Sequence, residues 1–336
     1  MELQILWFVL IVVLFTGFFF LEGFDYGVGM LLPFVGKSDI ERRQVLRTIL
    51  PVWDGNEVWM ITAGGASFAA FPHFYATMFS TFYLALFLML VCLILRGIAF
   101  ELRDRSESLT WRKNWDKAIV FGSTVPALLW GIAVTDLIAG LPINANMTYM
   151  GGFFGLLSPY SVIGGLTFVF VFAFHGAAFL SLRLANQSLI DRAQSIAKKA
   201  GALAVVFFVL CMVLTYMYTD LYDNTLAAAA LILAAVFFLI GYFSLMVGAS
   251  KRAFIGSSLA IVCTTVAFFA GLFPRLMVSS FDPAYSLTIY NSSSTPYTLF
   301  IMTIAAGILV PIVLAYQIYT YYIFRKRVTE KDLGHY

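Results

Sequence analysis

The sequence predicts an all-α integral membrane protein, a single polytopic domain over residues 1–336 with about nine transmembrane helices. Three observations indicate this class. Of the residues, 61% are hydrophobic and only 12% are charged, and the mean hydropathy is +0.89; soluble domains carry roughly 25% charged residues. The apolar residues form runs of the length that crosses a bilayer, about 20 residues each. Nearly all Lys and Arg residues lie in alternate connecting segments.

The apolar runs follow one another along the whole chain. The first run lacks a basic region and a small-residue cleavage site, so we expect a retained helix rather than a signal peptide. Its glycine-rich end predicts either a tilted helix or one that leaves the membrane before Pro33. A very short turn at Pro72 and His73 joins the second and third runs. The expected spans are 5–33, 53–71, 74–100, 117–140, 160–183, 198–219, 225–248, 254–274 and 297–324.

The distribution of basic residues predicts the orientation of the chain. Nineteen of the 21 Lys and Arg residues lie in segments 34–52, 101–117, 183–199, 249–253 and 325–336. The alternate connecting segments contain only Arg275. The positive-inside rule places the first set in the cytoplasm. The N-terminus is then outside and the C-terminus is cytoplasmic, as an odd number of spans requires.

A group of charged residues is expected near the cytoplasmic face. Because successive spans alternate in direction, the end of the first, the start of the second and the end of the third lie at the same depth. Two pairs of acids are spaced three residues apart, so each pair lies on one helix face. The group consists of Glu22, Asp25, Asp54, Glu57, Arg96 and Glu101.

These acids have a functional and a structural interpretation. Carboxyl groups inside a membrane cost several kcal/mol unless they are paired or hydrated, and crowded ones can hold a proton near neutral pH. A proton-uptake path requires such groups. In the structural interpretation, Arg96 neutralises one or two acids and the others reach the interface, which is the simpler reading for Glu22 and Glu101. For Asp25 and Asp54 we expect a functional role or an essential structural one.

The sequence around the acids is distinctive. Residues 21–31 read LEGFDYGVGML, residues 53–59 read WDGNEVW, and residues 61–72 read ITAGGASFAAFP. The glycines of these segments allow helix backbones to approach closely. The positions at which close approach is expected are Gly23, Gly27, Gly64 and Gly65.

Taken together, these segments resemble subunit II of the cytochrome bd family of quinol oxidases. The resemblance covers essentially the whole chain and includes a basic ERR loop at 41–43 and, further along, Arg96 with Phe100. It implies a place in the bacterial cytoplasmic membrane beside a haem-bearing subunit I. Haem b and haem d are then carried by subunit I, with quinol as substrate, and this chain alone binds no haem. A small accessory subunit, quinone and lipid are further expected partners; nucleic acid is not.

The resemblance also implies that cytoplasmic protons reach the oxygen-reducing haem partly through this chain. Asp54 of the WDGN motif is the first candidate, followed by Asp25 and by Glu57 on the face of Asp54. Tryptophan at a membrane interface is usually an anchor. The residues expected to pack beside the acids or to line a channel are Trp53, Asn56 and Trp59.

Other polar residues of the spans have simpler explanations. We expect a hydrogen-bonded structural role for His175 rather than haem ligation, and a helix-end or loop hydrogen bond for Asp136. No spacing of His, Cys or acidic residues predicts a metal site. Two alternatives to a proton-conducting oxidase subunit stay open. One is a solute transporter, although no internal repeat is visible and the acids lie off the midplane; the other is a purely structural scaffold for subunit I.

Overall fold

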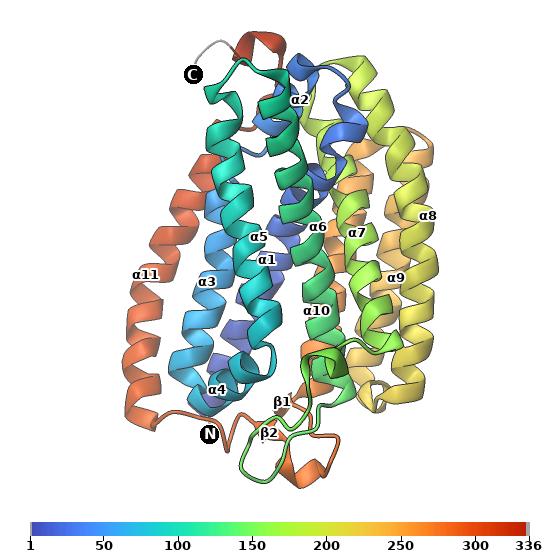
Figure 1. The fold of residues 1–336 in the computed structure, drawn as a ribbon. Helices are drawn as coiled ribbons and strands as arrows, with labels where there is room; N and C mark the ends of the chain where they lie inside the picture. Colours follow the sequence, from blue (N-terminus) through green and yellow to red (C-terminus); the bar gives the residue numbers. More distant parts are fainter. Residues whose placement is uncertain (1, 334–336) are drawn as a thin grey trace.

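The computed structural model describes residues 2–333, which form a bundle of long helices running between two ends (Figure 1). The long helices are α1 (Glu2–Val35), α3 (Trp53–Ala70), α5 (Tyr83–Leu102), α6 (Leu109–Ala139), α7 (Pro159–Arg183), α8 (Gln187–Tyr218), α9 (Thr225–Met246), α10 (Ser250–Leu272) and α11 (Pro296–Ile323). Shorter elements connect them. These are α2 (Asp39–Arg47), α4 (Pro72–Thr81), the antiparallel strands β1 (Arg275–Met277) and β2 (Leu287–Thr288), and single turns at Arg103–Arg105, Phe153–Leu156, Leu221–Asp223, Pro283–Tyr285 and Glu330–Leu333.

The predicted all-α membrane class is confirmed. Eight of the described helices, α1 and α5 to α11, are long and apolar enough to cross a membrane. The ninth expected span is α3, which has 18 residues and begins with a polar turn that contains Asp54, Asn56 and Glu57. Figure 1 shows α3 between α11 and the rest of the bundle. The count of nine therefore depends on α3 and stays a prediction.

The structure differs from the expected spans at one place. The expected third span, 74–100, is broken: α4 ends at Thr81 and α5 begins at Tyr83. The hydroxyl groups of Ser80 and Thr81 donate to the carbonyls of Ala76 and Thr77, at 2.8 and 2.7 Å. Such bonds compete with the helical ladder and bend helices. Helix α1 continues to Val35, two residues beyond the expected end of the first span.

The basic segments gather at one end of the bundle, here called the basic end. Figure 1 shows α2, the α5–α6 connection and the C-terminal segment together at this end, at the top of the view. The N-terminus and the β1–β2 hairpin lie at the opposite end, here called the hairpin end. The alternation of loops that the sequence predicts is therefore present. Which end faces the cytoplasm stays a prediction of the positive-inside rule.

Helix α1 occupies the middle of the bundle and α11 its edge. Helix α1 packs against α3, α6, α7 and α10, and the segment from Leu21 to Leu32 is buried throughout. Helix α11 stands beside α3 in Figure 1, and Leu299 is its one buried residue among those described. The central position of α1 places the acids of its second half inside the protein.

Candidate functional site

Close helix contacts bury the acidic turn of α1. Gly27 of α1 faces Gly176 of α7, and a Cβ atom at Gly27 would lie 2.0 Å from the carbonyl oxygen of Phe172. A Cβ atom at Gly23 would lie 2.8 Å from the Phe172 ring. The prediction of close approach at these two glycines is confirmed. For the other expected pair it stays a prediction, because no atom of another described segment lies within 4 Å of a Cβ built at Gly64 or Gly65.

Arg96 of α5 lies at the centre of the acid cluster. Its side chain is fully buried, and its Nη1 atom donates to Glu22 Oε1 and, at 2.9 Å, to Glu57 Oε1. The guanidinium carbon also lies 4.9 Å from the centroid of the Tyr26 ring, within the range of a cation–π contact. Gly122 of α6 makes room for it, since a Cβ atom there would lie 2.8 Å from the Cβ of Arg96.

Asp25 is held from the opposite side by Asn56. Both side chains are fully buried, and Asn56 Nδ2 donates to Asp25 Oδ2 at 2.6 Å. The hydroxyl of Tyr321 on α11 donates in turn to Asn56 Oδ1 at 2.7 Å. Asn56 is thus a hydrogen-bonding residue of the site, not only a packing residue. Tyr321 was not predicted from the sequence, because it lies 265 positions from Asn56 and no local pattern distinguishes it.

Several polar atoms of the cluster have no hydrogen-bond partner among the described residues. They are fully buried atoms of acids, a phenol and the guanidinium: Glu22 Oε2, Asp25 Oδ1, Tyr26 Oη, Arg96 Nε and Arg96 Nη2. Buried polar groups normally bond to protein or to water. The cluster therefore combines charge and burial with polar atoms that no described residue hydrogen-bonds.

The remaining predicted acids lie outside this cluster. Asp54 and Glu101 are exposed, and neither makes a hydrogen bond or ion pair within the described part of the chain. The expected gathering of all the acids is thus wrong for these two. Glu57 lies between the buried cluster and the exposed surface, with its side chain 15% exposed. It connects the buried cluster to the surface of α3 on which Asp54 lies.

The two tryptophans of α3 pack inside the bundle. The Trp53 ring lies 5.0 Å from the Phe100 ring, centroid to centroid. Trp59 Nε1 donates to Gln317 Oε1 of α11 at 2.8 Å, and its ring lies against Gly17 of α1. Packing and helix tethering are thus the contacts that the structure shows for these residues.

Two further predicted residues lie toward the middle and the hairpin end. His175 is fully buried between Ser257 Oγ, 2.7 Å from Nδ1, and the carbonyl of Phe20, 3.2 Å from Nε2. The expected hydrogen bonds of His175 are present, and its structural role stays a prediction. Asp136 is buried near the end of α6, and no residue of the described chain hydrogen-bonds its Oδ2 atom, so the expected hydrogen bond is not found at this atom. His335, the histidine of the C-terminal tail, lies outside the described residues.

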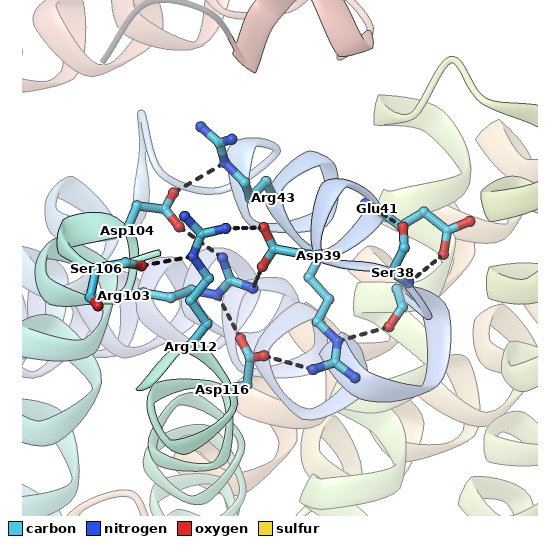
Figure 2. A network of polar contacts seen from close by, with 11 residues as sticks. Ser38, Asp39, Glu41, Arg43, Arg103, Asp104, Ser106, Arg112 and Asp116 are labelled. Carbon is cyan, nitrogen blue, oxygen red and sulfur yellow. Dashed lines mark hydrogen bonds and ion pairs between the residues drawn. The ribbon is translucent and has the colours of Figure 1, made fainter. Parts of the chain in front are cut away.

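A second polar network fixes the loop between α1 and α3 at the basic end (Figure 2). Arg103 donates to Asp116 Oδ1 at 2.6 Å and to Asp39 Oδ1 at 2.8 Å. Arg112 reaches the other oxygen of Asp39 at 2.5 Å, and Arg42 reaches Asp116 Oδ2 at 2.8 Å. No local sequence pattern predicts these pairs, which join α2 to the ends of α5 and α6. These ion pairs therefore fix the loop between α1 and α3 at the basic end, the end of the bundle near which the acid cluster lies.

The fold and the site define a polytopic membrane protein with a buried carboxylate–arginine cluster near its basic end. The family described as "Cytochrome bd terminal oxidase subunit II" matches residues 3–324. The chain therefore belongs to this family, and it is a multi-pass protein of the bacterial inner membrane and a subunit of an oxidoreductase. This result favours the oxidase interpretation over the solute transporter that the sequence left open.

Curated relatives and a solved structure agree with the family. The chain is 41% identical over 335 residues to the cytochrome bd ubiquinol oxidase subunit 2 of Bacillus subtilis (strain 168), covering 98% of each chain. It is 36% identical over 366 residues to the cytochrome bd-I ubiquinol oxidase subunit 2 of Escherichia coli (strain K12), covering 98% of this chain and 96% of that one. A chain of the bd oxidase from Geobacillus thermodenitrificans has a similar fold, with a TM-score of 0.78 and 19% identity over 97% of this chain and 100% of that chain.

Proposed function

We propose that this chain is the haem-free partner of subunit I in a quinol:oxygen oxidoreductase and that its acid cluster supplies cytoplasmic protons for the reduction of oxygen to water. The names of the relatives, which are ubiquinol oxidase subunits, support quinol as the electron donor. Haem b and haem d, which accept the electrons and bind oxygen, are assigned to subunit I. In this chain the one histidine buried within a span, His175, already has protein partners on both ring nitrogens.

The observation that carries the proton-supply role is the charge balance of the buried cluster. Glu22, Asp25 and Glu57 surround a single cation, Arg96. If all three acids were ionised, the cluster would contain two more negative than positive charges in surroundings with little water. Uncompensated buried charge costs several kcal/mol. The cluster is therefore stable only with bound protons, and it can pass them on as its neighbours change charge.

The surface of α3 offers a path from the cluster to the partner. Exposed residues recur on one face of α3 at helical spacing: Asp54, Val58, Ile61, Gly65 and Phe68. A charged residue at the head of a lipid-facing stripe would be costly, whereas small residues allow another helix to approach closely. We therefore assign this stripe, together with the neighbouring α11, to the contact with subunit I.

The resulting proton route is short. Protons enter from the basic end, which the positive-inside rule places in the cytoplasm. They pass through the buried acids around Arg96 to Glu57, which is partly exposed. Asp54, one helical turn before Glu57 on α3, transfers the protons to subunit I. If subunit I takes electrons from quinol on the outer side, a supply of protons from the inner side would separate charge across the membrane.

The test is quinol-dependent oxygen uptake by the purified complex. Asp54→Asn and Asp25→Asn are each expected to lower the rate at least about tenfold, because loss of a proton-transfer group typically costs 10²-fold or more, while haem content stays unchanged. Glu107→Gln is the matched control, since Glu107 is an exposed acid of the basic end outside the cluster. Full activity in both Asp variants would refute the proton-supply role. Loss of haem from the complex in both would instead indicate the purely structural scaffold.

A further inference from the structure

A hydrogen-bonded chain links the edge helix α11 to the buried Asp25. Tyr321 Oη lies 2.7 Å from Asn56 Oδ1, and Asn56 Nδ2 lies 2.6 Å from Asp25 Oδ2. Asn56 and Asp25 are fully buried, and the Tyr321 ring is partly buried against the core. Among the described residues, Asn56 is the one that hydrogen-bonds the Asp25 carboxyl group, since Asp25 Oδ1 has no partner.

The three residues can serve either protonation state of Asp25. In the observed direction the phenol donates to the amide oxygen and the amide nitrogen donates to the carboxyl oxygen, which suits an ionised Asp25. Rotating the amide by half a turn reverses both bonds. A protonated Asp25 then donates to Asn56 Oδ1, and Asn56 Nδ2 donates to the phenol oxygen. This works because an amide presents a donor and an acceptor, and a phenol is both at one atom.

We propose that Asn56 and Tyr321 are positioning residues that let Asp25 gain and lose a proton without losing its hydrogen bond. The proposal rests on the proton-supply role of the cluster and names the residues that make one step of it reversible. Leaving a buried polar group without its bond carries the full cost of its desolvation. A switchable partner removes that cost from both states. A fixed donor, such as a lysine or a backbone N–H, would favour the ionised state alone.

The surroundings of Asp25 fit this assignment. The other charged groups that face it are Glu22 on α1, Glu57 on α3 and Arg96 on α5. All of these interact with Asp25 through charge, and none of them hydrogen-bonds it. A merely structural tether between α11 and α3 already exists one turn away, where Gln317 accepts from Trp59 at 2.8 Å. The Tyr321 hydroxyl is therefore not needed to hold α11 in place.

The experiment uses infrared difference spectroscopy of the intact complex with subunit I, recorded across a pH titration. The carboxyl band that Asp25→Asn removes is compared in the parent, in Tyr321→Phe and in Tyr319→Phe. Tyr319 lies on the same helix, is 60% exposed and is the matched control. We expect the band to shift in Tyr321→Phe only, with oxygen uptake lowered about fivefold, the rate equivalent of one net hydrogen bond.

An unshifted band in Tyr321→Phe, or equal shifts in both tyrosine variants, would overturn the inference. If Tyr321→Phe does not assemble, Asn56→Ala gives the same readout while leaving the phenol ring in place. The outcome is separable from that of the proposed function. Full oxygen uptake in Asp25→Asn refutes the proton-supply role, whereas a slow Asp25→Asn variant with an unshifted Tyr321→Phe band refutes only the positioning role.

Discussion

Replacing Arg96 by Met leaves the buried acids without their cation and tests how the cluster is held. The side chains of Arg96 and Glu22 are both fully buried, and Glu57 is 15% exposed. Removing one partner of a buried ion pair typically costs 3–5 kcal/mol, since the other charge stays buried and unpaired. Methionine keeps the length and apolar volume of the arginine stem. We therefore expect Arg96→Met to destabilise the chain by about 4 kcal/mol.

The assay is the apparent melting temperature of the complex in mild detergent. A loss of about 4 kcal/mol corresponds to a fall of roughly 6 °C for a chain of this size. Lys113→Met is the control, because Lys113 is an exposed cation of the basic end. Adding Glu22→Gln to Arg96→Met should recover part of the loss, since the amide carries no charge. A melting temperature within about 2 °C of the parent, or no recovery in the double variant, would refute the charge-balance reasoning.

Three further predictions concern packing, the partner face and pH. Gly27→Ala should destabilise the chain by about 3 kcal/mol in thermal unfolding, since its Cβ would meet the Phe172 carbonyl at 2.0 Å; an unchanged midpoint would contradict the tight α1–α7 contact. Gly65→Leu should leave this chain folded but weaken co-purification of subunit I roughly tenfold, a cost of about 1.4 kcal/mol, and undiminished co-purification would argue against the α3 face. The hydrogen bond from Arg275 lowers the pKa of Asp220. Its stabilisation is therefore present above the unfolded pKa of about 3.9 and is lost progressively as the pH falls from there through the lower folded pKa, so Asp220→Asn should cost at most about 1 kcal/mol at pH 7 for this half-exposed pair and less as the pH falls below about 3.9.

Much of the fold could be predicted because the bilayer restricts what an apolar run can do. A run of 20 apolar residues must be a helix in lipid, so the spans and their alternation follow from hydropathy. The meeting of Glu22 with Arg96 also follows, since alternating directions place those two helix ends at one depth. The break at Phe82 does not follow, because it depends on which hydroxyls bond back to the helix, as Ser80 and Thr81 do here.

The details of the site depend on helix rotation, which the sequence alone does not determine. Asp54 and Glu57 are three residues apart and lie about 60° from each other around the axis. A small rotation of α3 decides which of them reaches Arg96, and the structure selects Glu57. Tyr321 joins the site through the position of α11, a contact between residues 265 positions apart. The open glycines of α3 likewise look unexplained in a single chain and become meaningful only with a partner.

The central claim is that protons for oxygen reduction pass through the buried acids of this chain. The most direct measurement is proton uptake from the basic-end side when oxygen is added to the reduced complex in proteoliposomes, with a pH indicator on that side. We expect Asp25→Asn to slow this uptake at least about tenfold while the haem content and the electron supply from quinol are unchanged. Uptake by Asp25→Asn at the parent rate would contradict it.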